Sequence, residues 1–410
     1  MIKIAVNLAL LLLISCRFLI EWFPLLGMPI ISSLLAGILY LCLFGGLLYT
    51  LSNHNAKHFN RSTKILFGLY VIYSLYIIYY VIISPQIPRD DMANVPESDI
   101  KLLMEMVIIG ITMFCVNAFY KLVNIDIWAK LTMFIILVTS IFYFMQVNIL
   151  LYTIYRHMFA TDPDMLASFG MIDSLAMGRY IGICFFCNLW LKGRITKNKW
   201  INLILFWLIA AYCFIVIVLI GQRGPILFLI TTTLFYYYCK KVTSVRKLFA
   251  YLFVVVVLLA VGIFSISYIS EDTAERFEGI EDDNGSGRFG DDDSEYNLAW
   301  DQIQQGPILG SYFRTTAISR TGNYPHNIVL EMLMTFGIVF SLPLFYILYK
   351  STKVCFCQIR DRGQGSLFCL MFVYILSCLM TSGTIVLNVY FWLLLTLVIA
   401  NQQKSVRTTI

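Results

Sequence analysis

Charged side chains are scarce in this sequence. Of its 410 residues, 13% are Asp, Glu, Lys or Arg, and 59% are hydrophobic. Globular domains carry about 25% charged and about 45–50% apolar residues, so the composition excludes a soluble Rossmann-type enzyme, a disordered tail protein and a basic nucleic-acid binder. The sequence also lacks an internal repeat and a low-complexity tract, which disfavours a repeat-built transporter. We therefore expect an all-α integral membrane protein.

Long apolar runs supply the candidate membrane spans. A bilayer crossing takes about 20 apolar residues, so about 12 transmembrane helices fit in this length only if most loops are short. The first run carries Arg17 and has no small-residue cleavage site after it, so we interpret it as a retained span. The runs lie at 4–22, 30–51, 65–83, 102–120, 127–150, 175–191, 201–220, 225–239, 248–269, 327–349, 366–382 and 384–400.

Basic residues are concentrated in alternate loops along this series of runs. Together with the two termini, these loops hold 20 of the 30 Lys and Arg residues but only two of the 24 acids, Asp126 and Asp361. The positive-inside rule places such loops in the cytoplasm, and both termini with them. The largest inner groups of basic residues lie at 57–64, 192–199, 240–247 and 350–362.

No cysteine lies in a predicted outer segment. The eleven cysteines fall in the apolar runs or in the inner loop around Cys355, so no disulfide framework is indicated. Cys184-x-x-Cys187 and Cys355-x-Cys357 lack the second pair or the histidines of a zinc site. We interpret these cysteines as small hydrophobic residues.

The largest predicted outer segment comprises residues 270–326. We expect residues 1–269 to contain nine transmembrane helices, residues 270–326 to form a periplasmic loop with short helices, and residues 327–410 to contain three more helices and a cytoplasmic tail. The large loop opens with an acidic stretch from Glu271 to Glu295 that lacks the spacing of an EF-hand. We interpret this stretch as solvated, and we expect no metal site there.

A helix is predicted inside the large loop. Apolar residues recur at helical spacing at Tyr296, Leu298, Trp300 and Ile303, and Gly306-Pro307 then breaks the pattern. A loop of this size that contains its own helix is usually functional. We therefore expect the functional site on the outer face.

Arginine dominates outside the inner loops. There the chain has nine arginines and one lysine, whereas lysine outnumbers arginine fourteen to six inside. A guanidinium group grips phosphate or carboxylate at two points, so we expect the outer face to bind a phosphorylated or acidic ligand. Pairing with the outer acids is the alternative, and we prefer it for Arg17, Arg89 and Arg276.

Two residues stand out at the outer membrane boundary. Arg223 lies in Gly221-Gln222-Arg223-Gly224-Pro225, between two spans, where an unpaired cation is costly and usually functional; a snorkelling helix-end arginine is the alternative. His326 joins the large loop to the tenth run, where a neutral imidazole can accept a proton from a hydroxyl. A helix-capping histidine is the alternative there.

The motifs occur in a characteristic order. Gln222-Arg223-Gly224 comes first, then Ser286-Gly287-Arg288, then Trp300 with Gly306-Pro307-Ile308-Leu309-Gly310, then His326-Asn327, Leu330-Glu331 and Gly337-Ile338. This ordered set resembles the bacterial O-antigen polymerase and O-antigen ligase superfamily. The chain has Gln222 where a serine is common, and Ser311-Tyr312 where a second glycine often follows.

The resemblance implies a multi-pass glycosyltransferase of the bacterial inner membrane. Its donor would be a sugar chain on undecaprenyl pyrophosphate, and it would need no nucleotide sugar, no other cofactor and no metal. By this resemblance Arg223 and Arg288 hold the pyrophosphate, and His326 is the base for the acceptor hydroxyl. Further candidate substrate-binding residues are Arg179, Arg314, Arg320 and Glu331.

Three functions remain open. Polymerases transfer the growing chain to a new lipid-linked repeat unit, whereas ligases transfer it to lipid A-core. We predict a polymerase, because departures from the better-defined ligase motifs fit the more divergent class. A lipid-linked oligosaccharide flippase is the alternative of another class, and it would carry its charges near the middle of spans. The expected partners are the bilayer, the lipid-linked oligosaccharide and, as a candidate, a chain-length regulator; no nucleic acid is expected.

The topology can be tested by cysteine labelling in a background free of native cysteines. We expect a membrane-impermeant thiol reagent to label position 290 in intact spheroplasts. Positions in 192–199 and 350–365 should react only after the membrane is permeabilised, because these segments carry the inner basic residues. Labelling of position 290 only after permeabilisation would reverse the assigned sides.

Overall fold

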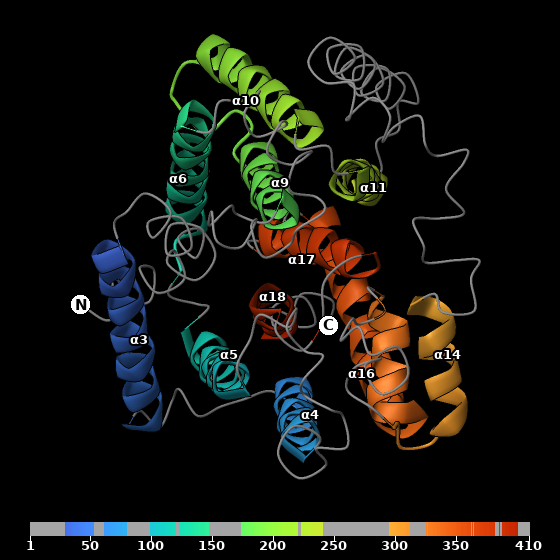
Figure 1. The fold of residues 1–410 in the computed structure, drawn as a ribbon. Helices are drawn as coiled ribbons and strands as arrows, with labels where there is room; N and C mark the ends of the chain where they lie inside the picture. The colour runs from blue at the N-terminus through green and yellow to red at the C-terminus, as the bar shows by residue number, and fades with distance from the viewer. Residues whose placement is uncertain are drawn as a thin grey trace, which may run out of the picture. The chain divides into compact units, whose positions relative to one another are not determined.

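The computed structural model describes residues 29–52, 61–79, 99–119, 123–146, 174–219, 223–240, 295–311, 325, 327–361, 363, 365–381, 385 and 388–400. Within these residues it contains eleven helices and no strand (Figure 1). The helices are α3 (Pro29–Ser52), α4 (Arg61–Ile78), α5 (Asp99–Phe119), α6 (Ile125–Gln146), α9 (Ser174–Trp190), α10 (Lys199–Leu219), α11 (Arg223–Cys239), α14 (Glu295–Gln305), α16 (Ile328–Arg360), α17 (Ser366–Leu379) and α18 (Val389–Ala400).

Ten of the twelve predicted spans coincide with these helices, and the all-helical prediction is confirmed for the described residues. The predicted spans 4–22 and 248–269 lie outside the described residues. By length and composition, the described segments long and apolar enough to cross a membrane are Lys199–Ile217 and Ile328–Arg360. Five shorter apolar segments lie in α3, α5, α11, α17 and α18. The total of about 12 spans and the sides of the loops stay predictions.

Helix α14, which matches none of the predicted spans, lies in the predicted outer loop and confirms the helix expected from the spacing of its apolar residues. It ends at Gln305, directly before the Gly306-Pro307 break. Leu298 and Ala299 are buried, whereas Trp300 is exposed. This difference is typical of a helix that packs along one face.

The chain divides into two compact units, each assembled from segments far apart in the sequence. The first comprises residues 1–48, 121–278 and 357–374, and the second comprises residues 49–120, 279–356 and 375–410. In the first unit α9 packs against α6, α10 and α11. In the second unit α18 packs against α4 and α5, and all twelve residues of α18 are buried, as expected of a helix that is apolar on every side.

Acids of the predicted inner loops pair with arginines of those loops in the first unit. Asp126 accepts hydrogen bonds from Arg194 at 3.3 Å and from the Trp190 indole at 3.0 Å. Asp361 pairs with Arg360 at 2.9 Å. These pairs are exposed, so each contributes little to stability. The contact between Asp126 and Arg194 is expected if the two loops lie on one side of the membrane, as their charges predict.

Helix α16 is longer than predicted. The apolar run was expected to end near residue 349, with residues 350–360 in a basic inner loop, but the helix continues to Arg360. The charged residues in this segment are compatible with a helix, and no glycine or proline occurs between Lys350 and Gly363. Ser366 then donates hydrogen bonds to the carbonyls of Gln358 and Gly363 and closes the connection to α17.

A break interrupts α16 at Gly337, which has φ 59° and ψ −175°. In an unbroken helix the amides of Ile338 and Val339 would donate to the carbonyls of Met334 and Thr335. Instead, Ile338 donates to Pro307 at 2.9 Å and Val339 donates to Ile308 at 3.2 Å, while the Met334 carbonyl accepts the Ser311 amide at 3.0 Å. We refer to this contact between residues 306–311 and 334–339 as the α14–α16 junction. Figure 1 shows α14 alongside α16.

Glycine is required at the α14–α16 junction for space as well as for conformation. A Cβ atom on Gly310 would lie 2.2 Å from the Thr335 carbonyl oxygen, and one on Gly337 would lie 2.4 Å from the Gly310 nitrogen. Both residues have a positive φ, +82° and +59°, which L side chains rarely adopt. The motif glycines at 306, 310 and 337 therefore allow the backbone of residues 306–311 to pack directly against that of residues 334–339.

We expect Gly310→Ala and Gly337→Ala to destabilise the protein strongly. The left-handed conformation alone costs about 1–2 kcal/mol for alanine, and the backbone clash adds to it because backbone atoms cannot move aside. Gly193→Ala is the matched control, since Gly193 has φ +77° but nothing within 4 Å of its Cβ position. Thermal unfolding in detergent should show a larger fall in Tm for the junction variants than for Gly193→Ala. Equal falls would mean that the junction is not closely packed.

Candidate functional site

The seven predicted site residues are described to different extents. Arg179 and Glu331 are described with their side chains, and Arg223 is the first residue of α11. The side chain of Arg223 lies outside the described part of the structure. The others that lie outside it are Arg288, Arg314, Arg320 and His326.

The turns that carry Arg179 and Arg223 are neighbours in the first unit. A Cβ atom on Gly178 of α9 would lie 2.7 Å from Pro225 Cγ of α11, so the two helices touch there. Arg179 follows Gly178 directly, and Arg223 lies two residues before Pro225. Arg179 is half-buried. The sequence showed no link between these two arginines.

Small residues on α9 create this close approach. Gly182 lies one helical turn after Gly178, and a Cβ atom there would lie 2.2 Å from the Tyr374 ring of α17. The Tyr374 hydroxyl donates a 2.9 Å hydrogen bond to the Gly178 carbonyl. Tyr374 and Pro225 therefore pack against the glycine face of α9, and these contacts fix the backbone on either side of Arg179.

The α11 start adds its own electrostatic feature. The first amides of a helix have no intrahelical acceptor, and the helix dipole favours an anion near them. Pro225 is tolerated in this first turn because its missing N–H is not needed there. This arrangement suits a group with two negative charges, because it combines the first amides of α11 with two basic residues, Arg223 and Arg179.

The start of α16 is held by Asn327. Its side-chain oxygen accepts hydrogen bonds from the amides of Val329 at 3.0 Å and Leu330 at 3.2 Å, which is the geometry of a helix N-cap. Pro325 on the other side of position 326 is buried. The cap explains why α16 begins at Ile328, two residues after the predicted catalytic position.

Two side chains link this first turn to the connection between α17 and α18. The Asn327 side-chain amide donates to the Met380 carbonyl at 3.2 Å. Glu331 is buried, with 1% of its surface exposed, and its Oε2 accepts the Ile385 amide at 3.0 Å. The Ile385 carbonyl in turn accepts the Trp392 indole N–H at 2.9 Å. The start of α16 is thus connected to α18.

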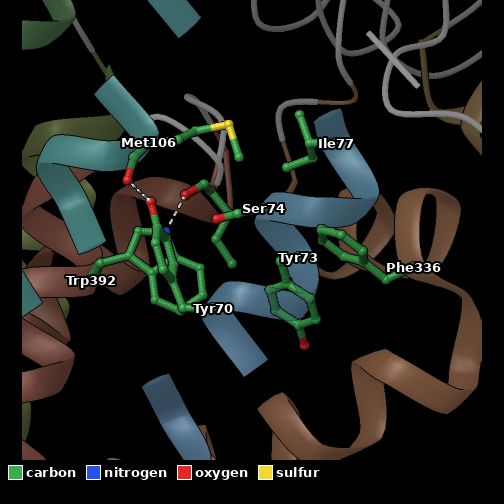
Figure 2. A pocket seen from close by; sticks show the side chains of 8 residues that line it. Tyr70, Tyr73, Ser74, Ile77, Met106, Phe336 and Trp392 are labelled. Carbon is green, nitrogen blue, oxygen red and sulfur yellow. Dashed lines mark hydrogen bonds between the residues drawn. The ribbon is translucent and has the colours of Figure 1, made fainter. Parts of the chain in front are cut away.

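Ile385 of this connection also helps to line a small cavity of about 10 Å³, which Figure 2 shows with residues of its lining. This is the space of about one water molecule, which is too small for a sugar. We therefore interpret the cavity as a packing feature of the second unit. Its lining includes Tyr70, Tyr73, Met106, Phe336, Ile385 and Trp392.

Tyrosines of α4 hold both sides of the α14–α16 junction. Tyr73 stacks on Phe336 with ring centroids 4.0 Å apart and donates to the Phe340 carbonyl at 2.5 Å. Figure 2 shows Tyr73 beside Phe336. Tyr76, one turn later, donates to the Leu309 carbonyl at 2.6 Å. The tyrosines thus connect α4 to the loop and to α16 beyond its break.

Sequence reasoning missed several of these residues. The Asn327 cap had a signal, because asparagine directly before an apolar run is typical of a helix start. The contacts of Tyr73, Tyr76 and Ile385 had no such signal. Tyr73 and Tyr76 bond to carbonyls 267 and 233 residues away, and Ile385 bonds to Glu331, 54 residues away, and such pairs leave no periodic pattern.

Residues 208–345 match the family model described as Wzy_C, O-antigen ligase. The match covers about a third of the chain and contains Arg223, Arg288, His326 and Glu331, whereas Arg179 lies before it. It confirms the family resemblance that the ordered motifs indicated. Members of this family are membrane enzymes of O-antigen and polysaccharide assembly, and they include both polymerases and ligases. No curated protein and no solved structure matches the chain.

Proposed function

We propose that this protein is a periplasmic-side glycosyltransferase that polymerises undecaprenyl-pyrophosphate-linked repeat units into O-antigen or a related surface polysaccharide. The observation that carries the proposal is the family match over residues 208–345, which contains Arg223, Arg288 and His326 in one segment. The enzyme would act in the bacterial inner membrane. A chain-length regulator is a candidate partner.

The proposed reaction is a single inverting displacement at the anomeric carbon of the donor. His326 takes the proton of the acceptor hydroxyl, the hydroxyl oxygen forms the new glycosidic bond, and the bond to the pyrophosphate breaks. The electron pair of that bond stays on the pyrophosphate, which leaves on its lipid. One base is sufficient for such a step, unlike the two carboxylates of a glycoside hydrolase.

Preorganised arginines suit this leaving group. Negative charge grows on the pyrophosphate as the bond breaks, and guanidinium groups already in place stabilise it without reorganising. The contact between α9 and α11 supports this assignment for Arg223, and it adds Arg179 as a second cation on a neighbouring turn. Arg314 and Arg320 are further candidates for the same anionic ligand.

The α14–α16 junction supports a shared site for Arg288 and His326. Arg288 lies seven residues before the start of α14, and His326 lies two residues before the start of α16. Because backbone hydrogen bonds fix the end of α14 to the break in α16, the two helices that follow Arg288 and His326 are joined to each other.

A ligase is the second candidate function, because the matching family model carries the description O-antigen ligase. The lipopolysaccharide ladder of a deletion strain separates the two. We expect core with one repeat unit, which indicates loss of a polymerase. Bare core with accumulated lipid-linked polymer would instead indicate loss of a ligase.

We expect Arg223→Lys and Arg288→Lys to lose most polymer although they keep the charge. A lysine ammonium is a point charge and cannot replace the two-pronged grip of guanidinium on pyrophosphate. Arg89→Lys is the control and should be nearly silent. Ladders should be compared at matched expression, and near-normal ladders from both lysine variants would remove the bidentate contact from the mechanism.

We expect His326→Ala to fold and bind the lipid-linked donor while transfer falls by about 100-fold or more, the usual scale for loss of a positioned general base. A histidine that only supports the start of α16, where Asn327 already caps the helix, would instead lower stability and leave transfer per folded molecule unchanged. The measurement is single-turnover transfer by purified protein beside thermal unfolding of the same sample.

Full transfer by a folded His326→Ala variant would contradict the role of histidine as the base. If wild-type protein shows no transfer but moves the lipid-linked sugar across liposome membranes, the flippase alternative is favoured and the proposed function is wrong.

A further inference from the structure

We propose that Glu331 is a positioning residue of the transfer site, and that it acts together with Asn327 by fixing the first turn of α16 to the connection between α17 and α18. The activity part of this inference rests on the proposed function. Its structural part rests on two hydrogen bonds, one that the Asn327 side chain donates and one that the Glu331 side chain accepts.

The two hydrogen bonds start from the same turn and end on the same connection. Asn327 donates from its side chain to Met380 at 3.2 Å, and Glu331 accepts the Ile385 amide at 3.0 Å. Position 326 directly precedes Asn327. Rotation or translation of this turn would therefore break both bonds, and the proposed base is attached to a turn with a defined position.

The far end of the connection is itself held. Ile385 is bonded on both sides of its backbone, by Glu331 at the amide and by the Trp392 indole at the carbonyl. Trp392 makes an edge contact with Tyr70, with ring centroids 5.0 Å apart. The Tyr70 hydroxyl then donates to the Met106 carbonyl of α5 at 2.6 Å. The contacts therefore extend from α16 through α18 and α4 to α5.

A buried carboxylate is a costly choice for a purely structural bond. Glu331 is almost wholly buried, and burial of a charged group is unfavourable unless it is well paired. Its place in the first turn of α16 reduces this cost, since the helix dipole favours negative charge there, and a charged acceptor strengthens the hydrogen bond from Ile385. These features favour a strong, directional link at this site.

The functional consequence follows from the sensitivity of transfer to geometry. Misplacement of a reacting group by about 1 Å can cost about 100-fold in rate. Loss of the link should therefore lower kcat, while KM for the donor stays nearly constant, because the arginines that hold the pyrophosphate belong to other turns.

The test compares Glu331→Ala, Glu331→Gln and Tyr212→Phe in purified full-length protein. Glutamine keeps an oxygen that can accept the Ile385 amide, whereas alanine removes the acceptor. Tyr212→Phe is the matched control, because it removes one hydrogen bond between α10 and α6, from Tyr212 to Ser140 at 2.7 Å. We expect Glu331→Ala to lose about 10-fold or more in kcat with donor KM within about two-fold, and Glu331→Gln to keep most activity. Tyr212→Phe should lower only Tm.

Asn327→Ser is the second variant, and it covers the case in which Glu331→Ala does not fold. Serine caps a helix about as well as asparagine but lacks the side-chain amide that donates to Met380. We expect kcat to fall with KM unchanged. Normal kcat in both Asn327→Ser and Glu331→Ala would overturn the proposal. Equal loss in Glu331→Gln and Glu331→Ala with a raised KM would also overturn it, in favour of direct substrate binding.

Hydrogen exchange provides a measurement that does not depend on activity. We expect faster exchange at the Ile385 amide in Glu331→Ala than in wild type, and no change there in Tyr212→Phe. If wild-type protein shows no transfer, the proposed function fails while this exchange result still decides whether the link exists. Unchanged exchange at Ile385 would overturn the structural part of the inference.

Discussion

Backbone amides and carbonyls that leave a helix inside a membrane protein must find partners within the protein, because lipid offers none. The break at Gly337 frees such groups in the middle of α16, and residues 307–311 satisfy them through three backbone hydrogen bonds. This one requirement explains much of the second unit. It demands glycine at the points of closest approach, and it fixes the end of α14. The carbonyls of Leu309 and Phe340 on either side of the contact accept hydrogen bonds from Tyr76 and Tyr73 of α4.

The same unit carries a second fixed point ten residues earlier, at the Asn327 cap of α16. Between the cap and the break lies Glu331, whose carboxylate contacts Ile385. The helix that follows the proposed base is therefore fixed at both ends of its first three turns. In the first unit, glycines on α9 perform a comparable task for the turns that carry Arg179 and Arg223. A backbone fixed in this way beside charged residues is what electrostatic preorganisation requires.

Much of the fold could be predicted from the sequence, because apolar runs and the Gly306-Pro307 break are local signals. Ten predicted spans coincide with helices, and α14 ends where its break was expected. The extension of α16 to Arg360 was missed because charged residues were interpreted as a loop, although no helix breaker was present. The site was predictable only as a set of motifs. The contact of Gly310 with Thr335 and that of Gly178 with Pro225 join distant segments, and periodicity carries no information about such pairs.

Residues 312–324 lie between two residues whose positions are fixed by hydrogen bonds, and this affects how the length of the segment can change in evolution. Ser311 is bonded to Met334, and Asn327 is bonded to the α16 amides and to Met380. For a chain segment closed between fixed ends, doubling its length costs only about 0.6 kcal/mol in closure entropy. Insertions and deletions between the two anchors are therefore inexpensive, and they leave the hydrogen bonds on either side intact. This segment contains Arg314 and Arg320, so the spacing of these two arginines can change while both anchors keep their places.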